Sequence, residues 1–366
     1  MRHSYSFNLF FCYVQYSGTT FLKINFSVIY CYFICFCVIN CYLCTIPIYY
    51  TMFKEFNSLA ELMAAFPDEQ TCIEYLEYRR WHGNVVSPYD ATSKVYKCKG
   101  NNYKCRNTGL YFNVKTGTLF HRSSIPLLKW FMAIWLITAH KKGISSIQLG
   151  KDISVTQKTA WLMLHKIREV FGDENDLHDD NQGNDGKLAN NVEIDESFIG
   201  GKNKNRHRDK KVEKCQGRSF KDKVPVFGLL ERGKRVIAKV VSDTKVKTLQ
   251  PLIFRYVRAG CNLYSDEWDY GKDTDMFYYH RHVDHGKGFY GKGDLTSNSI
   301  ESFWALVKRS IIGIYYHWSK KHMQRYIDEC VFRFNTRKYS DKQRFDLFLQ
   351  NIVGCRTTYK ELIYAN

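Results

Sequence analysis

The order of predicted strands and helices after residue 191 limits the fold more than any other feature of this 366-residue sequence. Alternating apolar residues predict a strand over residues 192–199 and a β-hairpin over residues 223–243 that turns at Arg232-Gly233. A helix over residues 247–258 and a strand over residues 261–268 follow. Because strands both precede and follow this helix, we expect an α/β domain with a mixed sheet flanked by helices.

The first of these strands carries an unusual density of acidic residues. It begins the stretch VEIDESFIGGK, which contains Glu193, Asp195 and Glu196. Acidic residues are poor strand formers, so three of them in one strand need an explanation. Side chains alternate between the two faces of a strand, so Asp195 shares a face with Glu193, whereas Glu196 lies on the opposite face with Val192 and Ile194. A role for Asp195 in metal binding explains why such a strand is retained.

Two further acids complete a candidate metal site. Asp266 lies near the end of the 261–268 strand, and Glu301 lies 35 residues later in a predicted helix over residues 298–317. Magnesium prefers a few carboxylates together with water and phosphate oxygens, and divalent metals activate the attacking oxygen in phosphodiester chemistry. We therefore expect Asp195, Asp266 and Glu301 to bind Mg²⁺ or Mn²⁺.

Each of these acids also has a purely structural interpretation. An aspartate at a strand end is often a turn former, and Asn298 and Glu301 have the spacing of a capping box. Lys308 follows Glu301 by seven residues, close to two helical turns, so the two side chains share one side of the helix. This arrangement fits metal binding with a phosphate contact, and it also fits a surface ion pair. The strand order, which is that of an RNase H-like core, favours the metal site.

The charge of the chain indicates a polyanionic partner. It contains 54 Lys and Arg against 36 Asp and Glu, a formal net charge of +18. Nucleic acid fits better than a membrane surface, because the basic residues are interleaved with Tyr, Phe and Trp. No feature points to a small-molecule substrate.

Two segments are candidates for DNA contact. Two predicted helices within residues 141–171, joined at 152–155 with Ser154 as the cap of the second, have helix-turn-helix spacing that points Gln157 and Lys158 toward a groove. An ordinary helical hairpin is the alternative. A basic loop follows the Asp195 strand and should make binding salt-dependent, unless it is only solvated. Its candidate residues are Lys202, Lys204, Arg206, Arg208, Lys210 and Lys211.

Further helices and a small sheet are predicted elsewhere in the chain. Residues 57–80 should form a helix capped by Ser58, residues 95–120 a small β-meander, and residues 125–140 a buried helix. A second long helix at 319–338, capped by Ser319, should follow the one that carries Glu301. Six of the 13 cysteines lie in the first 44 residues, and the other seven are scattered singly along the rest of the chain, which favours reduced thiols in a cytoplasmic protein.

The first 51 residues differ in composition from the rest. They contain no Ala, Asp, Glu or Trp, and residues 27–50 are long and apolar enough to span a bilayer. A membrane anchor is one interpretation. We favour a non-native extension, translated from A/T-rich upstream DNA, with Met52 as the natural start.

Several long motifs resemble one known family. VEIDESFIGGK, NLYSDEW, TSNSIESFWALVKRSIIGIYYHWSKKHMQRYIDECVFRFNTRK and the helical segment TGTLFHRSSIPLLKWFMAIWLITAHKKGISSIQLGKDISVTQKTAWLMLHKIR are similar to the ISXO2-like branch of bacterial insertion-sequence DDE transposases, over roughly residues 55–345. The resemblance implies an RNase H-like catalytic domain behind a zinc ribbon and a helix-turn-helix. It also implies phosphoryl transfer on transposon ends by a homo-oligomer.

The resemblance assigns roles residue by residue. Asp195 and Asp266 match the first two catalytic acids, and family members carry Asn or Glu as the third residue, followed by Lys. Here Asn298 and Glu301 both compete for the third position, with Lys308 as the lysine. We favour Glu301 because it shares a helix side with Lys308, and Asn298 stays the alternative because an amide oxygen also binds metals.

The chain departs from the family in its ribbon. The two expected Cys-x-x-Cys pairs read Ser87-Pro-Tyr-Asp90 and Cys105-Arg-Asn-Thr108, so one cysteine of four is present. A closed zinc site needs four ligands, and we expect this module to fold without structural zinc.

These observations predict a DNA transposase that cleaves and joins phosphodiesters at insertion-sequence ends, with terminal repeats and target DNA as partners. The alternative is a non-catalytic DNA-binding protein derived from one. We expect a bacterial, nucleoid-associated location in the cytoplasm, not a membrane. The expected segments are an extension at 1–51, a helix with a degenerate zinc-ribbon-like β module at 52–122, a helix-turn-helix region at 123–172, a linker at 173–190, an RNase H-like catalytic domain at 191–345 and a tail at 346–366.

Overall fold

The computed structural model describes most of the chain after residue 54. It describes residues 55–172, 186–200, 207–211, 223–265, 270, 272–282 and 298–364. All of them belong to one compact unit, Thr51–Asn366. The expected extension and most of the expected linker lie outside the described residues. Among the helices that are described, none combines the length and the apolar character needed to cross a membrane.

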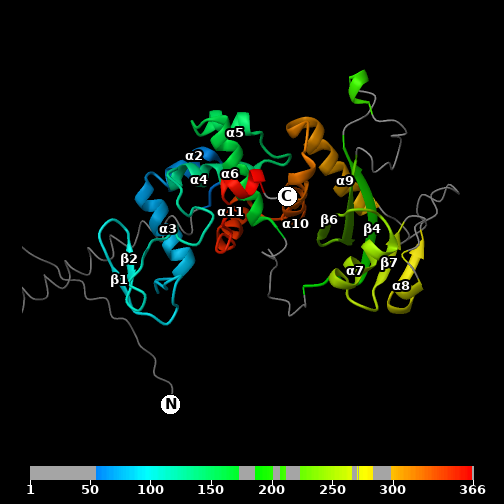
Figure 1. Cartoon of the computed structure of the whole chain (residues 1–366), viewed down its shortest axis with the longest axis horizontal. Helices are drawn as coiled ribbons and strands as arrows, with labels where there is room; N and C mark the ends of the chain where they lie inside the picture. Colours follow the sequence, from blue (N-terminus) through cyan, green and yellow to red (C-terminus); the bar gives the residue numbers. More distant parts are fainter. Residues whose placement is uncertain are drawn as a thin grey trace, which may run out of the picture. The chain divides into compact units, whose positions relative to one another are not determined.

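A five-stranded mixed sheet organises the second half of the chain (Figure 1). The strand order is β6-β5-β4-β7-β8, with β4 at the centre. β4 pairs antiparallel with β5 and parallel with β7, while β5 and β6 are antiparallel and β7 and β8 parallel. The bounds are β4 Asn191–Ile199, β5 Val224–Glu231, β6 Val236–Val240, β7 Asn262–Ser265 and β8 Tyr279–His282. The predicted mixed α/β architecture is confirmed.

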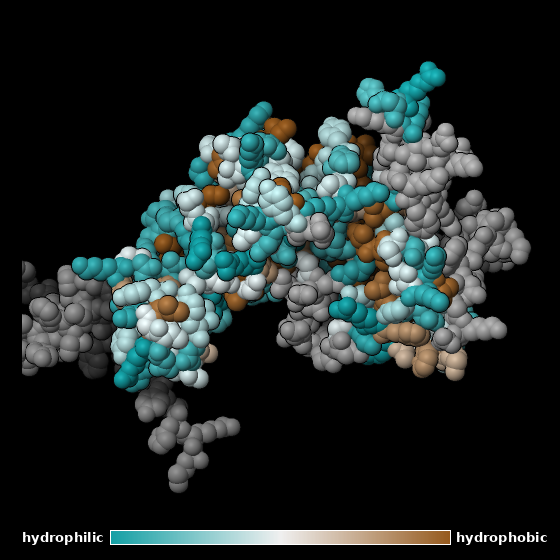
Figure 2. All heavy atoms as spheres, in the orientation of Figure 1, coloured by the Kyte–Doolittle hydropathy of each residue, from teal (hydrophilic) through white to brown (hydrophobic). Residues whose placement is uncertain are grey.

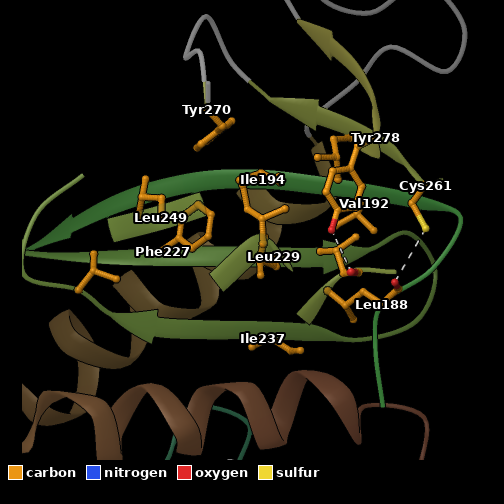
Figure 3. Close-up of a cluster of buried hydrophobic side chains, with 14 residues drawn as sticks. Leu188, Val192, Ile194, Phe227, Leu229, Ile237, Leu249, Cys261, Tyr270 and Tyr278 are labelled. Atoms are coloured by element: carbon orange, nitrogen blue, oxygen red, sulfur yellow. Dashed lines mark hydrogen bonds between the residues drawn. The ribbon is translucent and has the colours of Figure 1, made fainter. Parts of the chain in front are cut away.

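Helices cover both faces of this sheet. Helix α7 (Val246–Tyr256) covers one face, where Val192 and Ile194 of β4 join a buried cluster with Leu249 (Figure 3). Helices α9 (Asn298–Ser310) and α10 (Met323–Asn335) cover the other face, where Ile199 packs with Phe303 and Ile327. A short helix α8 (Lys272–Phe277) and strand β8 follow β7 and were not predicted, because their polar sequence shows no strand periodicity.

The two long helices are shorter than predicted. The expected helix at 298–317 changes after Ser310 into a π-helical turn, η5 (Ile311–Tyr315). The next begins with a 3₁₀ turn, η6 (Lys320–His322), so Ser319 does not cap α10. Tyr316 has a φ of +57°, which ends helical geometry, and the rings of Tyr315 and Trp318 turn back to pack on Tyr326.

The first half of the described chain is mainly helical. It contains α2 (Leu59–Ala65), α3 (Glu69–Trp81), α4 (Leu127–Ala139) and a small antiparallel sheet of β1 (Val95–Lys97), β2 (Tyr103–Cys105) and β3 (Tyr111–Phe112). Ser58 caps α2 as predicted, since its side chain accepts from the N–H of Glu61. The single predicted helix at 57–80 is wrong: Pro67 interrupts it, and Asp68 caps α3 by accepting from the N–H of Thr71.

Two further helices, α5 (Ser146–Asp152) and α6 (Gln157–Val170), form the predicted helical pair. The cap of α6 is Thr156, which accepts from the N–H of Thr159, and not Ser154, which has a φ of +52° and lies in the turn. Apolar residues that recur at helical spacing along α6 and at its C-cap are buried, namely Ala160, Leu164, Ile167 and Phe171. Helices α11 (Asp341–Gln350) and α12 (Tyr359–Tyr364) follow, and Phe345 of α11 packs against Phe131 of α4.

A buried ionic cluster joins α6 to α10. Arg168 Nε donates to Glu329 Oε2 at 2.6 Å, and Arg333 and the hydroxyl of Tyr315 donate to the other carboxylate oxygen. Arg168 also lies over the ring of Tyr326, 4.1 Å from its centroid. Burial opposes ionisation, but the attraction of Glu329 outweighs it and raises the pKa of Arg168. The cluster connects the helical pair with a helix that covers the sheet.

Candidate active site

The site is built around Asp195 on the central strand. Asp195 pairs with Gly228 of β5, and its Oδ1 accepts from the N–H of Glu196 at 2.8 Å. Ile199, two alternations further on the same face, packs with α9, whereas Ile194 packs with α7. Asp195, which lies on the same face of β4 as Glu193 and Ile199, therefore faces the side of the sheet that α9 covers.

Glu193, on the same face as Asp195, fixes the start of α9. Its side chain is fully buried, and its two carboxylate oxygens accept from Arg232 Nε at 2.7 Å and from the N–H of Ile300 at 2.8 Å. The N–H groups of the first helical turn have no partner within the helix, so a carboxylate there is stabilising. Glu193 thus ties the first turn of α9 to β4, two residues from Asp195.

Gly228 lets α9 approach the sheet at the position of Asp195. A Cβ atom on Gly228 would lie 2.6 Å from Cζ2 of Trp304 and 3.2 Å from Cδ1 of Ile300. A side chain at this position would push the helix away. The residue opposite Asp195 is small because the helix passes over it.

Asn298, Glu301 and Lys308 all lie on α9. All three are exposed, while Ile300 and Trp304 face the sheet. The helix is continuous from Asn298 to Ser310, so Glu301 and Lys308 lie on one side of it, two turns apart. Glu193 supplies a carboxylate that binds the start of the helix, at the N–H of Ile300.

Asp266 lies outside the described residues, but the strand that leads to it does not. Ile194 of β4 pairs with Ser265 of β7 in parallel register, and these are the residues directly before Asp195 and Asp266 in the chain. Among the described residues, which exclude Asp266, no three His, Cys, Asp or Glu side chains lie close enough together to hold a metal ion.

A second hydrogen-bonded group lies on the opposite face and was missed from the sequence. Ser265 Oγ and His280 Nε2 are 2.7 Å apart, and His280 Nδ1 is 3.3 Å from Asp275 Oδ1. The hydrogen-bonded sequence Ser–His–Asp is that of a serine hydrolase triad, but Ser265 is fully buried. The sequence of β8 has no strand periodicity, so the contact between Ser265 and His280 was not predictable. The group connects β7 to β8.

Glu196, which had no predicted role, also has a partner on this face. The hydroxyl of Tyr270 donates to Glu196 Oε1 at 2.8 Å, and the Tyr270 ring lies 5.8 Å from that of His280. Of the three acids in the VEIDESFIGGK motif, Glu193 and Glu196 therefore bind residues on opposite faces of β4.

Only some of the predicted DNA-contacting residues are among the described residues. Gln157 and Lys158 are exposed at the start of α6, and Gln157 Nε2 donates to Ser146 Oγ of α5 at 3.0 Å. Arg208 and Lys211 are exposed around a short 3₁₀ turn, η3 (Arg208–Lys210). Lys202, Lys204, Arg206 and the side chain of Lys210 lie outside the described residues.

Comparison with known proteins identifies the sheet-containing segment. Residues 187–335 match the family model of the ISXO2-like transposase domain. This segment is an ISXO2-like transposase domain. The domain begins just before β4 and ends with α10, so it contains Asp195, Asp266, Asn298, Glu301 and Lys308.

A relative from Halobacterium salinarum supports this assignment. It is described as an uncharacterized protein in transposable element ISH50, and it is 28% identical to this chain over 260 residues. The match covers 67% of this chain and 83% of the relative, so it extends beyond the transposase domain. The relative is archaeal, whereas the sequence motifs led us to expect a bacterial element.

Proposed function

We propose that this chain is a DNA transposase. It cleaves phosphodiester bonds at insertion-sequence ends and joins the cleaved ends to target DNA. The observation that carries the proposal is the arrangement around β4. Asp195 lies under α9, Glu193 holds the start of that helix, and the residues before Asp195 and Asp266 are paired. The strand order, three antiparallel strands followed by two parallel ones, is that of an RNase H-like core, and the family match covers it.

The residues fit a hard divalent cation. Carboxylate oxygens from Asp195, Asp266 and Glu301 suit Mg²⁺ or Mn²⁺, with the amide oxygen of Asn298 as the alternative third donor. When bound, the ion supplies Lewis-acid chemistry that activates the attacking oxygen and offsets charge on the leaving one. Lys308, on the Glu301 side of α9, contacts a phosphate near this site.

The remaining parts position the DNA. The helical pair α5–α6 binds the terminal repeat through Gln157 and Lys158, and the basic loop after β4 grips the backbone through residues such as Arg208 and Lys211. The small sheet β1–β3 folds without zinc, since Ser87, Asp90 and Thr108 replace three of the four cysteines of a zinc ribbon. The active form is a homo-oligomer.

Cleavage of the element's own labelled ends tests this function. The full chain should cut them in Mg²⁺ or Mn²⁺ but not in EDTA, and binding in EDTA should weaken steeply as salt rises. Binding without cleavage in either metal would instead support the alternative, a non-catalytic DNA-binding protein derived from a transposase.

A further inference from the structure

The small sheet β1–β3 presents an outer face that the proposed function does not use. Tyr96 on β1 pairs with Lys104 on β2, and Lys104 pairs with Tyr111 on β3. The three side chains therefore form a single row across the sheet. Tyr96 is 51% exposed and Tyr111 is 61% exposed, and Lys104 Nζ lies 5.5 Å from the centroid of the Tyr111 ring.

The opposite face of this sheet is fixed. Tyr103 and Phe112 stack with ring centroids 5.7 Å apart, and both contact the ring of Trp81 on α3. Arg80 Nη1 donates to the carbonyl of Val114, which adds a polar tie to the same helix. The outer row is thus held on a rigid base and loses little freedom when a ligand binds.

The turns at the edge of the sheet are joined by hydrogen bonds. Asn107 Nδ2 donates to Asp90 Oδ2 at 2.8 Å, and the N–H of Asn107 donates to Ser93 Oγ at 3.0 Å. These hydrogen bonds connect the turn that begins at Ser87 with the turn that begins at Cys105. They fix the positions of the two turns relative to each other.

Charge around the row is strongly positive. Residues 87–112 contain five basic residues and one acid, Asp90. The basic residues are Lys94, Lys97, Lys99, Lys104 and Arg106, and all except the half-buried Lys104 are exposed. Figure 2 shows residues of intermediate hydropathy beside strongly hydrophilic ones in the region of β1 and β2. A flat aromatic face with surrounding cations complements unpaired bases and their phosphates.

We propose that the row Tyr96–Lys104–Tyr111 binds single-stranded DNA, with one base stacked on each tyrosine and a phosphate at Lys104. Antiparallel strands lie about 4.8 Å apart, so the two tyrosines, two strands apart, receive bases that are separated rather than stacked on each other. The contact rests on the DNA-binding part of the proposed function and is independent of cleavage. It provides a place for the strand that becomes unpaired at an opened element end.

Binding of a fluorescein-labelled oligo-dT 16-mer to the full chain in EDTA tests this proposal. Removal of each ring, in Tyr96→Ala and Tyr111→Ala, should weaken binding about five- to tenfold, which corresponds to the loss of one exposed stacking contact. Tyr96→Phe and Tyr111→Phe keep the ring and should stay within about twofold of wild type. Tyr364→Ala, which removes a tyrosine that is 77% exposed on α12, is the matched control and should also be unchanged.

Three results would overturn the proposal. One is oligo-dT binding that survives the double alanine variant. Another is an equal or larger loss for a duplex of the same length, or equal or tighter binding of the matching RNA, since these would assign the face to another ligand. The third is a change in oligomeric state in the alanine variants, which would make the face an interface between copies. Because cleavage is not measured, a failure of the transposase assignment leaves this test unaffected.

Discussion

The three acids of the motif at residues 193–196 do different jobs despite adjacent positions. Strand alternation sends Glu193 and Asp195 to the α9 face and Glu196 to the α7 face, where Tyr270 binds it. Glu193 is fully buried with two partners, whereas Asp195 is only half-buried. Asp195, on the α9 face and two residues from the start of that helix, is the acid that we propose for metal binding.

The third catalytic residue can be decided by two substitutions. We expect Glu301→Gln to reduce metal-dependent cleavage roughly 100-fold or more, because it removes a charged metal ligand, whereas Asn298→Ala should cost less than about tenfold. Both side chains are exposed on α9, so the fold should be unaffected. Single-turnover cleavage of labelled ends gives the two rates. The opposite ranking would assign the role to Asn298.

His165 should make the stability of the protein depend on pH. Burial lowers its pKa to about 2, and within the described part of the chain neither ring nitrogen has a hydrogen-bond partner. Below pH 6.5 the unfolded chain binds a proton that the folded chain does not, so stability should fall as the pH falls. From pH 7 to pH 5 the loss should be about 2 kcal/mol.

Urea unfolding at both pH values measures this effect. His165→Phe should remove about this much of the difference, and His317→Gln, at an exposed position, should leave it unchanged. His322, whose pKa burial also lowers, supplies a smaller contribution of the same sign. An unaltered difference in the His165 variant would show that the ring is not held neutral.

Among the contacts between elements, the hydrogen bond from the N–H of Ile300 to Glu193 positions α9 on β4 next to Asp195. Glu193→Leu removes the acceptor of both Arg232 and the N–H of Ile300, and breaking such a buried pair should cost about 3–5 kcal/mol. Glu193→Gln keeps an acceptor for the helix and should cost clearly less. Urea unfolding separates the two, with exposed Glu55→Gln as the control. Equal losses in both variants would mean that the helix contact contributes nothing.

Much of this architecture is predictable from local patterns, and the errors have physical causes. The central strand, the hairpin, α4 and the α5–α6 pair have clear periodicity or turn residues, so their prediction succeeds. The predictions of helix caps and helix ends fail where residues outside the local pattern determine the backbone conformation. Thr156 caps α6, for example, because Ser154 adopts a positive φ in the preceding turn. The role of Glu193 was not predictable, since its partners lie 39 and 107 residues away. Asp266 and most of the basic loop lie outside the described residues, so their placement stays a prediction.

At the scale of the whole chain, the described regions on either side of residues 173–185 are connected by side chains far apart in sequence. Arg168 of α6 and Glu329 of α10 are 161 residues apart and fully buried together. Glu329 also binds Tyr315, in the turn that ends α9. A helix proposed to contact the terminal repeat is therefore bonded to the transposase domain, close to the end of the helix that carries Glu301.

The proposed function depends most on Asp195 as a metal ligand for phosphodiester cleavage. The decisive measurement is the Mg²⁺-dependent cleavage rate of labelled element ends by Asp195→Asn, with Glu196→Gln, on the other face of the strand, as the matched control. We predict a loss of roughly 100-fold or more for Asp195→Asn with DNA binding retained, and a rate within about tenfold of wild type for the control. Cleavage by Asp195→Asn at the wild-type rate would rule out Asp195 as an essential metal ligand.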